Sequence, residues 1–237
     1  MLKTHFSVDG IPCTLWGVKS EEKVILAVHG NFSHKEDTCI EILAEEAVKN
    51  GYQVLSFDLP AHGDRIHDEK ECHVIQAVSD IQCIHAHVRE RFSEIALFAC
   101  SMGASFSLIA LQPGNFSQTF FLSPVVDLLG LVRKMMHRAG IDEEQLFREK
   151  VIAVTDGSAF RADYVDYLRQ HPPAVWEGEL SILIGSEDTV ADYADVQRFS
   201  RQQGSAMEVV EGAEHYFHKP VELERLRSWL RRALISN

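Results

Sequence analysis

The sequence predicts an α/β fold in which helices cover both faces of a mostly parallel β-sheet. Short, continuous apolar runs recur along the chain, as in residues 24–28 and 95–99. Such runs are typical of strands that are buried on both faces of a parallel sheet. Segments with apolar side chains at helical spacing separate these runs, and the alternation indicates βαβ units.

The expected elements follow one another in a regular order. Asp9-Gly10 suits a tight turn, so residues 4–8 and 11–18 predict an N-terminal hairpin. The later strands are predicted at residues 24–28, 53–57, 95–99, 119–122, 180–184 and 207–210. Helices are predicted at residues 36–49, 71–92, 102–111, 192–203 and 221–235.

Residues 124–178 interrupt this alternation. They contain helical pieces near residues 128–138, 143–148 and 163–169 and one short strand-like run at 151–154. We interpret this segment as a short helical cap inserted over the sheet. Since neither an internal repeat nor a low-complexity linker is found, we expect residues 1–237 to form a single domain with this insertion.

Composition and charge exclude several classes of protein. The chain has 237 residues, of which 46% are hydrophobic, as is usual for a globular domain. The formal net charge of -12 disfavours binding to nucleic acid or to an anionic membrane, because both require clustered Lys and Arg. No apolar run approaches the roughly 18 residues of a membrane span.

The cysteines and histidines give no sign of a disulfide framework or a metal site. The five cysteines are odd in number and form no Cys-x-x-Cys pair, which favours reduced thiols and a cytoplasmic location. His85 and His87 lie two residues apart on a predicted helix and therefore point to different faces. We expect no metal and no cofactor.

The pentapeptide ACSMG at residues 99–103 lies where a buried strand is followed by a helix. A sharp turn there holds the central residue in a strained conformation and needs small residues two positions to either side, which Ala99 and Gly103 supply. The turn would present the Ser101 hydroxyl at the edge of the sheet, beside the positive end of a helix. The other interpretation is that Ser101 serves only as the N-cap of that helix.

Two more loops place reactive side chains after predicted strands. Asp188 follows the strand at 180–184, and His215 follows the strand at 207–210. The carboxyl ends of parallel strands are where α/β sheets gather their sites. We therefore expect Ser101, Asp188 and His215 to lie at the same edge of the sheet.

With these features the chain resembles the α/β-hydrolases, which share its serine turn and its Ser–acid–His order. The resemblance spans nearly the whole chain and includes His29-Gly30 after the first buried strand. Ala99 is a departure, because the family usually has Gly there. The resemblance implies the α/β-hydrolase fold, with Ser101 as nucleophile, His215 as general base and Asp188 as the acid that orients it.

The resemblance also implies an oxyanion hole and a substrate pocket. The backbone N–H groups of Asn31 and Met102 would form the oxyanion hole. The cap would roof the pocket, and the candidate lining residues are Phe32, Leu128, Val132 and Trp176. The apolar side chains of the cap could equally well serve to pack it onto the core.

Neighbouring residues compete for these roles. Glu187 precedes the family position of the acid by one residue, and Asp192 suits the start of the following helix. His218 lies at a helix entrance, where a surface position is expected. His29 and His62 are expected to be structural in their loops.

The residues and the resemblance together predict a serine hydrolase that cleaves a carboxylic ester or thioester through an acyl-enzyme on Ser101. The acyl group is expected to be small or medium in size. The alternatives are an amide or peptide hydrolase, a C–C hydrolase or lyase on the same scaffold, and a ligand-binding protein without turnover. The expected partner is a small-molecule acyl substrate, with neither nucleic acid nor membrane involved.

Overall fold

The computed structural model describes residues 1–18, 22–67, 72–154 and 159–235. The strands of its main sheet are β1 Lys3–Val8, β2 Ile11–Trp16, β3 Lys23–Val28, β4 Tyr52–Phe57, β5 Glu94–Cys100, β6 Thr119–Leu122, β9 Leu180–Gly185 and β10 Ala206–Val210. They form an eight-stranded sheet in the order β1-β2-β4-β3-β5-β6-β9-β10. The strands from β4 to β10 are parallel, whereas β1 and β2 pair antiparallel at one edge. The predicted α/β-hydrolase fold is confirmed.

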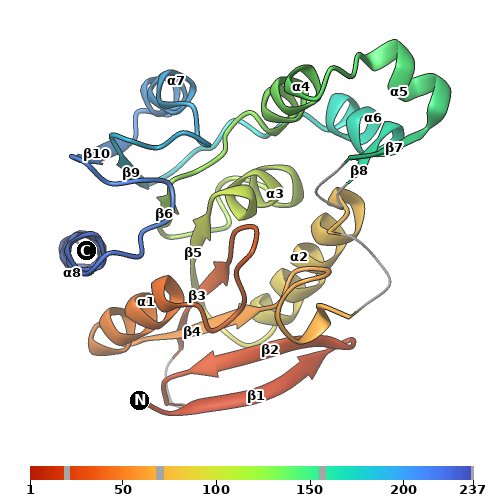
Figure 1. Ribbon diagram of the computed structural model, residues 1–237. Helices are drawn as coiled ribbons and strands as arrows, with labels where there is room; N and C mark the ends of the chain where they lie inside the picture. Colours follow the sequence, from red (N-terminus) through yellow and green to blue (C-terminus); the bar gives the residue numbers. More distant parts are fainter. Residues whose placement is uncertain (19–21, 68–71, 155–158, 236–237) are drawn as a thin grey trace.

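Helices cover both faces of this sheet, as Figure 1 shows. The helices α1 Thr38–Lys49 and α8 Pro220–Ile235 pack together on one face. The helices α2 Val74–Arg89, α3 Met102–Ala110 and α7 Tyr193–Gln203 pack on the other. Helix α2 is shorter at its C-terminal end than the sequence predicted, and residue 71, where we expected it to begin, lies outside the described residues.

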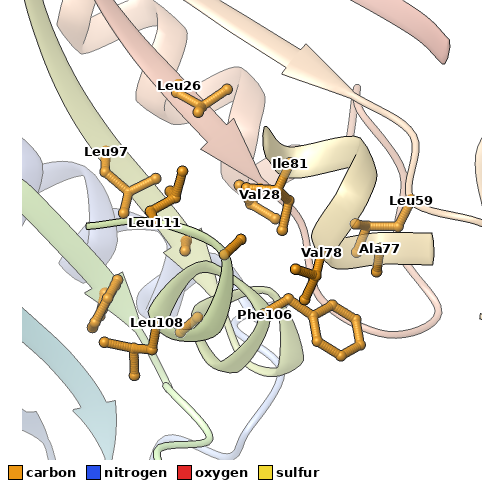
Figure 2. Close-up of a cluster of buried hydrophobic side chains, with 14 of the residues drawn as sticks. Leu26, Val28, Leu59, Ala77, Val78, Ile81, Leu97, Phe106, Leu108 and Leu111 are labelled. Atoms are coloured by element: carbon orange, nitrogen blue, oxygen red, sulfur yellow. The ribbon is translucent and has the colours of Figure 1, made fainter. Parts of the chain in front are cut away.

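The continuous apolar runs are explained by two hydrophobic cores, one on each face. Leu26 and Val28 of β3 join the first core, which Figure 2 shows with Ile81 of α2 and Phe106 of α3. Ile25, between Val24 and Leu26, joins the second core with α1 and α8. Because each of these side chains is fully buried, each stabilises the fold by about 1.5–3 kcal/mol.

Between β6 and β9 the chain forms a separate group of elements. These are α4 Leu128–Arg138, α5 Glu143–Glu149, β7 Val151–Ala153, β8 Ala159–Arg161 and α6 Ala162–Gln170. The strands β7 and β8 pair antiparallel, and Met136, Leu146 and Val165 form a small core of their own. Figure 1 shows the group together at the upper right, beyond α3. Strand β8 was not predicted, because three residues are too few to show a strand pattern.

None of the helices in the described ranges is long and apolar enough to cross a membrane.

Candidate active site

Ser101 occupies the sharp turn between β5 and α3. Its φ of 49° and ψ of -120° lie in a region that costs a non-glycine residue on the order of 1–3 kcal/mol. The Ser101 N–H donates to the Leu122 carbonyl (3.0 Å), and the Val125 N–H donates to the Ser101 carbonyl (3.1 Å). These bonds to β6 and the loop after it hold the turn in its strained conformation.

Two glycines let the loop after β3 pack directly against this turn. A Cβ on Gly103 would lie 2.3 Å from the His29 carbonyl oxygen, so a side chain at this position would collide with the backbone. A Cβ on Gly30 would lie 3.1 Å from the Cβ of Ser101. The need for a small residue at 103, which the sequence predicted, therefore arises from this close approach.

The three residues predicted from the strand ends lie in one hydrogen-bonded line. The Ser101 Oγ is 2.7 Å from His215 Nε2, and His215 Nδ1 is 2.8 and 2.9 Å from the two oxygens of Asp188. The side chains of His215 and Asp188 are 4% and 0% exposed. Because Nδ1 faces a carboxylate, it carries the ring proton, and Nε2 is left free to accept the proton of the Ser101 hydroxyl.

The loops after β9 and β10 are held together by backbone contacts. The Glu187 N–H donates to the Ala213 carbonyl (2.9 Å), and a Cβ on Gly185 would lie only 2.1 Å from that same carbonyl oxygen. The Asp188 Oδ1 also accepts the N–H groups of Val190 (2.9 Å) and Ala191 (2.8 Å). The carboxylate is thus fixed towards His215 before any ligand binds.

The rival acids and histidine lie elsewhere. Glu187 is exposed. Asp192 caps α7, since its Oδ1 accepts the N–H groups of Ala194 and Asp195. The side chain of His218 is 60% exposed and bonds the Tyr216 carbonyl. These positions agree with the surface and capping roles expected for them.

Asn31 and Met102 line the same cavity as Ser101. Met102 is the first residue of α3, and the first N–H groups of a helix have no partner within it. The next N–H along the loop, that of Phe32, instead donates to His62 Nε2 (3.1 Å). His62 in turn bonds the Pro60 carbonyl through Nδ1 (2.8 Å), so its ring braces the loop that carries Asn31.

His29 holds the same loop through two further hydrogen bonds. Its Nδ1 lies 2.7 Å from the Gly30 carbonyl, and its Nε2 accepts the N–H of Leu59 (3.0 Å). The neutral ring satisfies both contacts, whereas a protonated ring could no longer accept from Leu59. Burial lowers the pKa of His29 to about 4.

This lowered pKa predicts a pH-dependent loss of stability. Between pH 6.5 and about 4 the unfolded chain binds a proton at His29 that the folded chain does not. The free energy of unfolding should therefore fall with decreasing pH, with His29 contributing about 1.4 kcal/mol per pH unit. Urea unfolding at pH 7.5 and pH 5.0 should show this loss.

His29→Gln is the matched comparison for this prediction. The variant is expected to be less stable than the wild type at pH 7.5 but to lose less stability on acidification. His85, whose pKa burial also lowers, is present in both proteins and does not affect the difference between them. Equal pH slopes in the two proteins would contradict the assignment to His29.

Two cavities meet at Ser101. The larger has a volume of about 470 Å³ and is lined by residues of the serine turn, the loop after β3, the β9 and β10 loops, α4 and α6. Phe32, Leu128 and Val132 line it, as proposed from the sequence. The smaller cavity, of about 180 Å³, shares Asn31, Ser101, His215 and Tyr216 with the larger.

Trp176 does not line either of these cavities. It is 2% exposed, its Nε1 donates to the Thr119 hydroxyl (3.0 Å), and its ring packs against Phe116 and Phe121. Trp176 therefore belongs to the core beside β6, and the interpretation from the sequence that it reaches the pocket is wrong. Its position just before β9 gave no information about the direction of its side chain.

Other parts of the cavity wall were missed from the sequence. Arg138 and Arg161 lie on the wall, as do Tyr164 of α6 and His73 before α2. Only Arg138 carried a usable signal, since it follows Leu128, Leu131 and Met135 at intervals of three and four residues. Among the residues that the structure describes, no group of three or more His, Cys, Asp or Glu is placed to hold a metal ion.

Comparisons with known proteins agree with this architecture. Est1E from Butyrivibrio proteoclasticus, solved with bound ferulic acid, superimposes with a TM-score of 0.77 at 18% identity, covering 98% of each chain. An esterase from Pyrococcus furiosus gives a TM-score of 0.67 at 19% identity, covering 98% of this chain and 90% of the other. No curated protein sequence matches. A model of the alpha/beta hydrolase family matches residues 25–225, and the chain therefore belongs to the alpha/beta hydrolase family.

Proposed function

We propose that this protein is a serine hydrolase that cleaves carboxylic ester or thioester bonds in substrates with a small or medium acyl group. The observation that carries the proposal is the hydrogen-bonded line from Ser101 through His215 to Asp188, which opens onto a cavity. A serine that served only as a helix cap would need neither an imidazole at 2.7 Å nor a buried carboxylate behind it.

The geometry suits acyl transfer through a covalent intermediate. His215 takes the proton of the Ser101 hydroxyl as the oxygen attacks the carbonyl carbon, and Asp188 stabilises the imidazolium that forms. The N–H groups of Asn31 and Met102 would stabilise the oxyanion, each contributing about 3–4 kcal/mol in comparable sites. His215 then protonates the departing alcohol or thiol, and a water molecule, activated by the same ring, releases the acid from Ser101.

The two cavities fit the two arms of an ester. We assign the acyl arm to the larger, because both proposed oxyanion residues line it. The smaller accommodates a compact leaving group. Of the two cavities, only the larger has a volume within the usual range of ligand sites. The larger cavity is lined mainly by apolar side chains. Esterases among the structural neighbours, and the ferulic acid bound to one of them, are consistent with a small-molecule substrate.

Labelling by a fluorophosphonate probe tests the proposal. The folded protein should form one covalent adduct, located on Ser101 by peptide mass spectrometry, because only an activated serine attacks such a probe rapidly. Ser101→Ala should abolish the adduct, and Ser117→Ala, which alters an exposed serine, should retain it. The absence of an adduct on folded wild-type protein would refute the serine hydrolase assignment.

Turnover separates the reaction classes. Hydrolysis of p-nitrophenyl esters by the unlabelled protein, lost in Ser101→Ala, would establish ester cleavage. A protein that forms the adduct but is inert towards esters and thioesters of every acyl length would refute the ester assignment.

A further inference from the structure

The larger cavity carries a charge that ester cleavage alone does not require. Arg138 and Arg161 line it, whereas no Asp or Glu is found among its described lining residues. The whole chain has 35 acidic and 23 basic residues, so composition does not explain a wall with basic charge only. A cavity of this kind favours an anionic group in the ligand.

Helix α4 separates this charge from the apolar side chains at the start of the same wall. One face of α4 lines the cavity with Leu128, Leu131, Val132, Met135 and Arg138. The helix begins near Ser101, whose carbonyl accepts the N–H of Val125. Arg138 is ten residues after Leu128, which corresponds to about 15 Å along the helix axis. The part of the wall that α4 forms is therefore apolar from Leu128 to Met135 and ends in the guanidinium group of Arg138.

Further hydrogen-bonding groups lie on the same wall. Helices α4 and α6 share a small core in which Met136 packs with Ala162, so that the end of α4 lies beside the start of α6. Arg161 there is paired with Asp163 (3.2 Å). By contrast, Arg138 has no carboxylate partner among the described residues, and the hydroxyl of Tyr164 has no hydrogen-bond partner among them.

We propose that the acyl arm of the substrate ends in a carboxylate, which Arg138 binds at the far end of the cavity. The substrate class is then a monoester or thioester of a dicarboxylic acid with an apolar chain of medium length. A guanidinium group binds a carboxylate through two parallel hydrogen bonds, and the Tyr164 hydroxyl supplies a further donor on the same wall. This assignment rests on the proposed ester cleavage and specifies its substrate.

Two series of p-nitrophenyl esters test the proposed binding of a terminal carboxylate by Arg138. In one the acyl chain ends in a methyl group, and in the other it ends in a carboxylate, at matched chain lengths. We expect the ratio of kcat/KM, carboxylate over methyl, to be about 10 or more for chains long enough to reach Arg138. For the shortest chains the ratio should be 1 or below, because their carboxylate lies among Leu128 and its apolar neighbours.

Arg138→Gln is expected to lower the ratio for the long chains at least about tenfold. Arg133→Gln is the matched control, since Arg133 lies on the same helix but does not line the cavity, and it should keep the wild-type ratio. Thermal melting checks that both variants are folded.

The outcomes separate this inference from the proposed function. Equal cleavage of the two series at all lengths would overturn the carboxylate assignment and leave ester cleavage established. A preference that is unchanged in Arg138→Gln would likewise overturn it. If the wild type cleaved neither series, the ester cleavage proposed above would fail, and this inference would fail with it.

Discussion

Replacing Ser101 by alanine is expected to lower kcat for ester hydrolysis by about 10⁵- to 10⁶-fold, the range typical of a lost serine nucleophile. The substitution removes the Oγ, which lies 2.7 Å from His215 Nε2. The residual rate would come from binding and from the oxyanion groups alone. Steady-state hydrolysis of p-nitrophenyl esters measures the loss.

The fold should survive this change. Alanine has the same Cβ as serine, so the strain at φ 49° is unaltered, and the backbone bonds to Leu122 and Val125 remain. Urea unfolding is therefore expected to show only a small change in stability. A Ser101→Ala protein that is folded and keeps more than a few per cent of the wild-type kcat would show that another group is the nucleophile.

The sequence predicted most of the fold because the sheet is buried on both faces. In β3 and β5 every position from Val24 to Val28 and from Ile95 to Ala99 is buried, and both strands therefore appear as continuous apolar runs. The short strand β8 lacked such a signal, since Ala159, Phe160 and Arg161 are only partly buried and pair in a two-stranded sheet. Its existence depends on the partner strand rather than on its own pattern.

The candidate site was likewise predicted from the sequence only in part. The positions of Ser101, Asp188 and His215 follow from the order of parallel strands, because each residue lies in the turn or loop after a strand. The cavity wall depends instead on how α4 and α6 pack against each other. Nothing in the local pattern around Tyr164 or Trp176 indicates that the first lines the cavity and the second lies in the core.

The second large effect is expected for Asp188→Asn, which should lower kcat by about 10⁴-fold with little change in KM. The Oδ1 of Asp188 accepts the N–H groups of Val190 and Ala191. In the variant these donors hold the amide oxygen in the same place, so the amide NH₂ faces His215 Nδ1. That nitrogen must then act as an acceptor, which moves the ring proton to Nε2.

An Nε2 that carries a proton cannot accept one from the Ser101 hydroxyl, so the base is lost although each side chain keeps its position. Asp192→Asn is the matched control, because Asn is as good an N-cap as Asp and the activity should be retained. The kcat and the fluorophosphonate labelling rate of both variants measure the loss of the base, and thermal melting distinguishes this tautomer effect from unfolding. A folded Asp188→Asn protein with near wild-type kcat would mean that the carboxylate does not determine the protonation of His215, and the proposed mechanism would have to be abandoned.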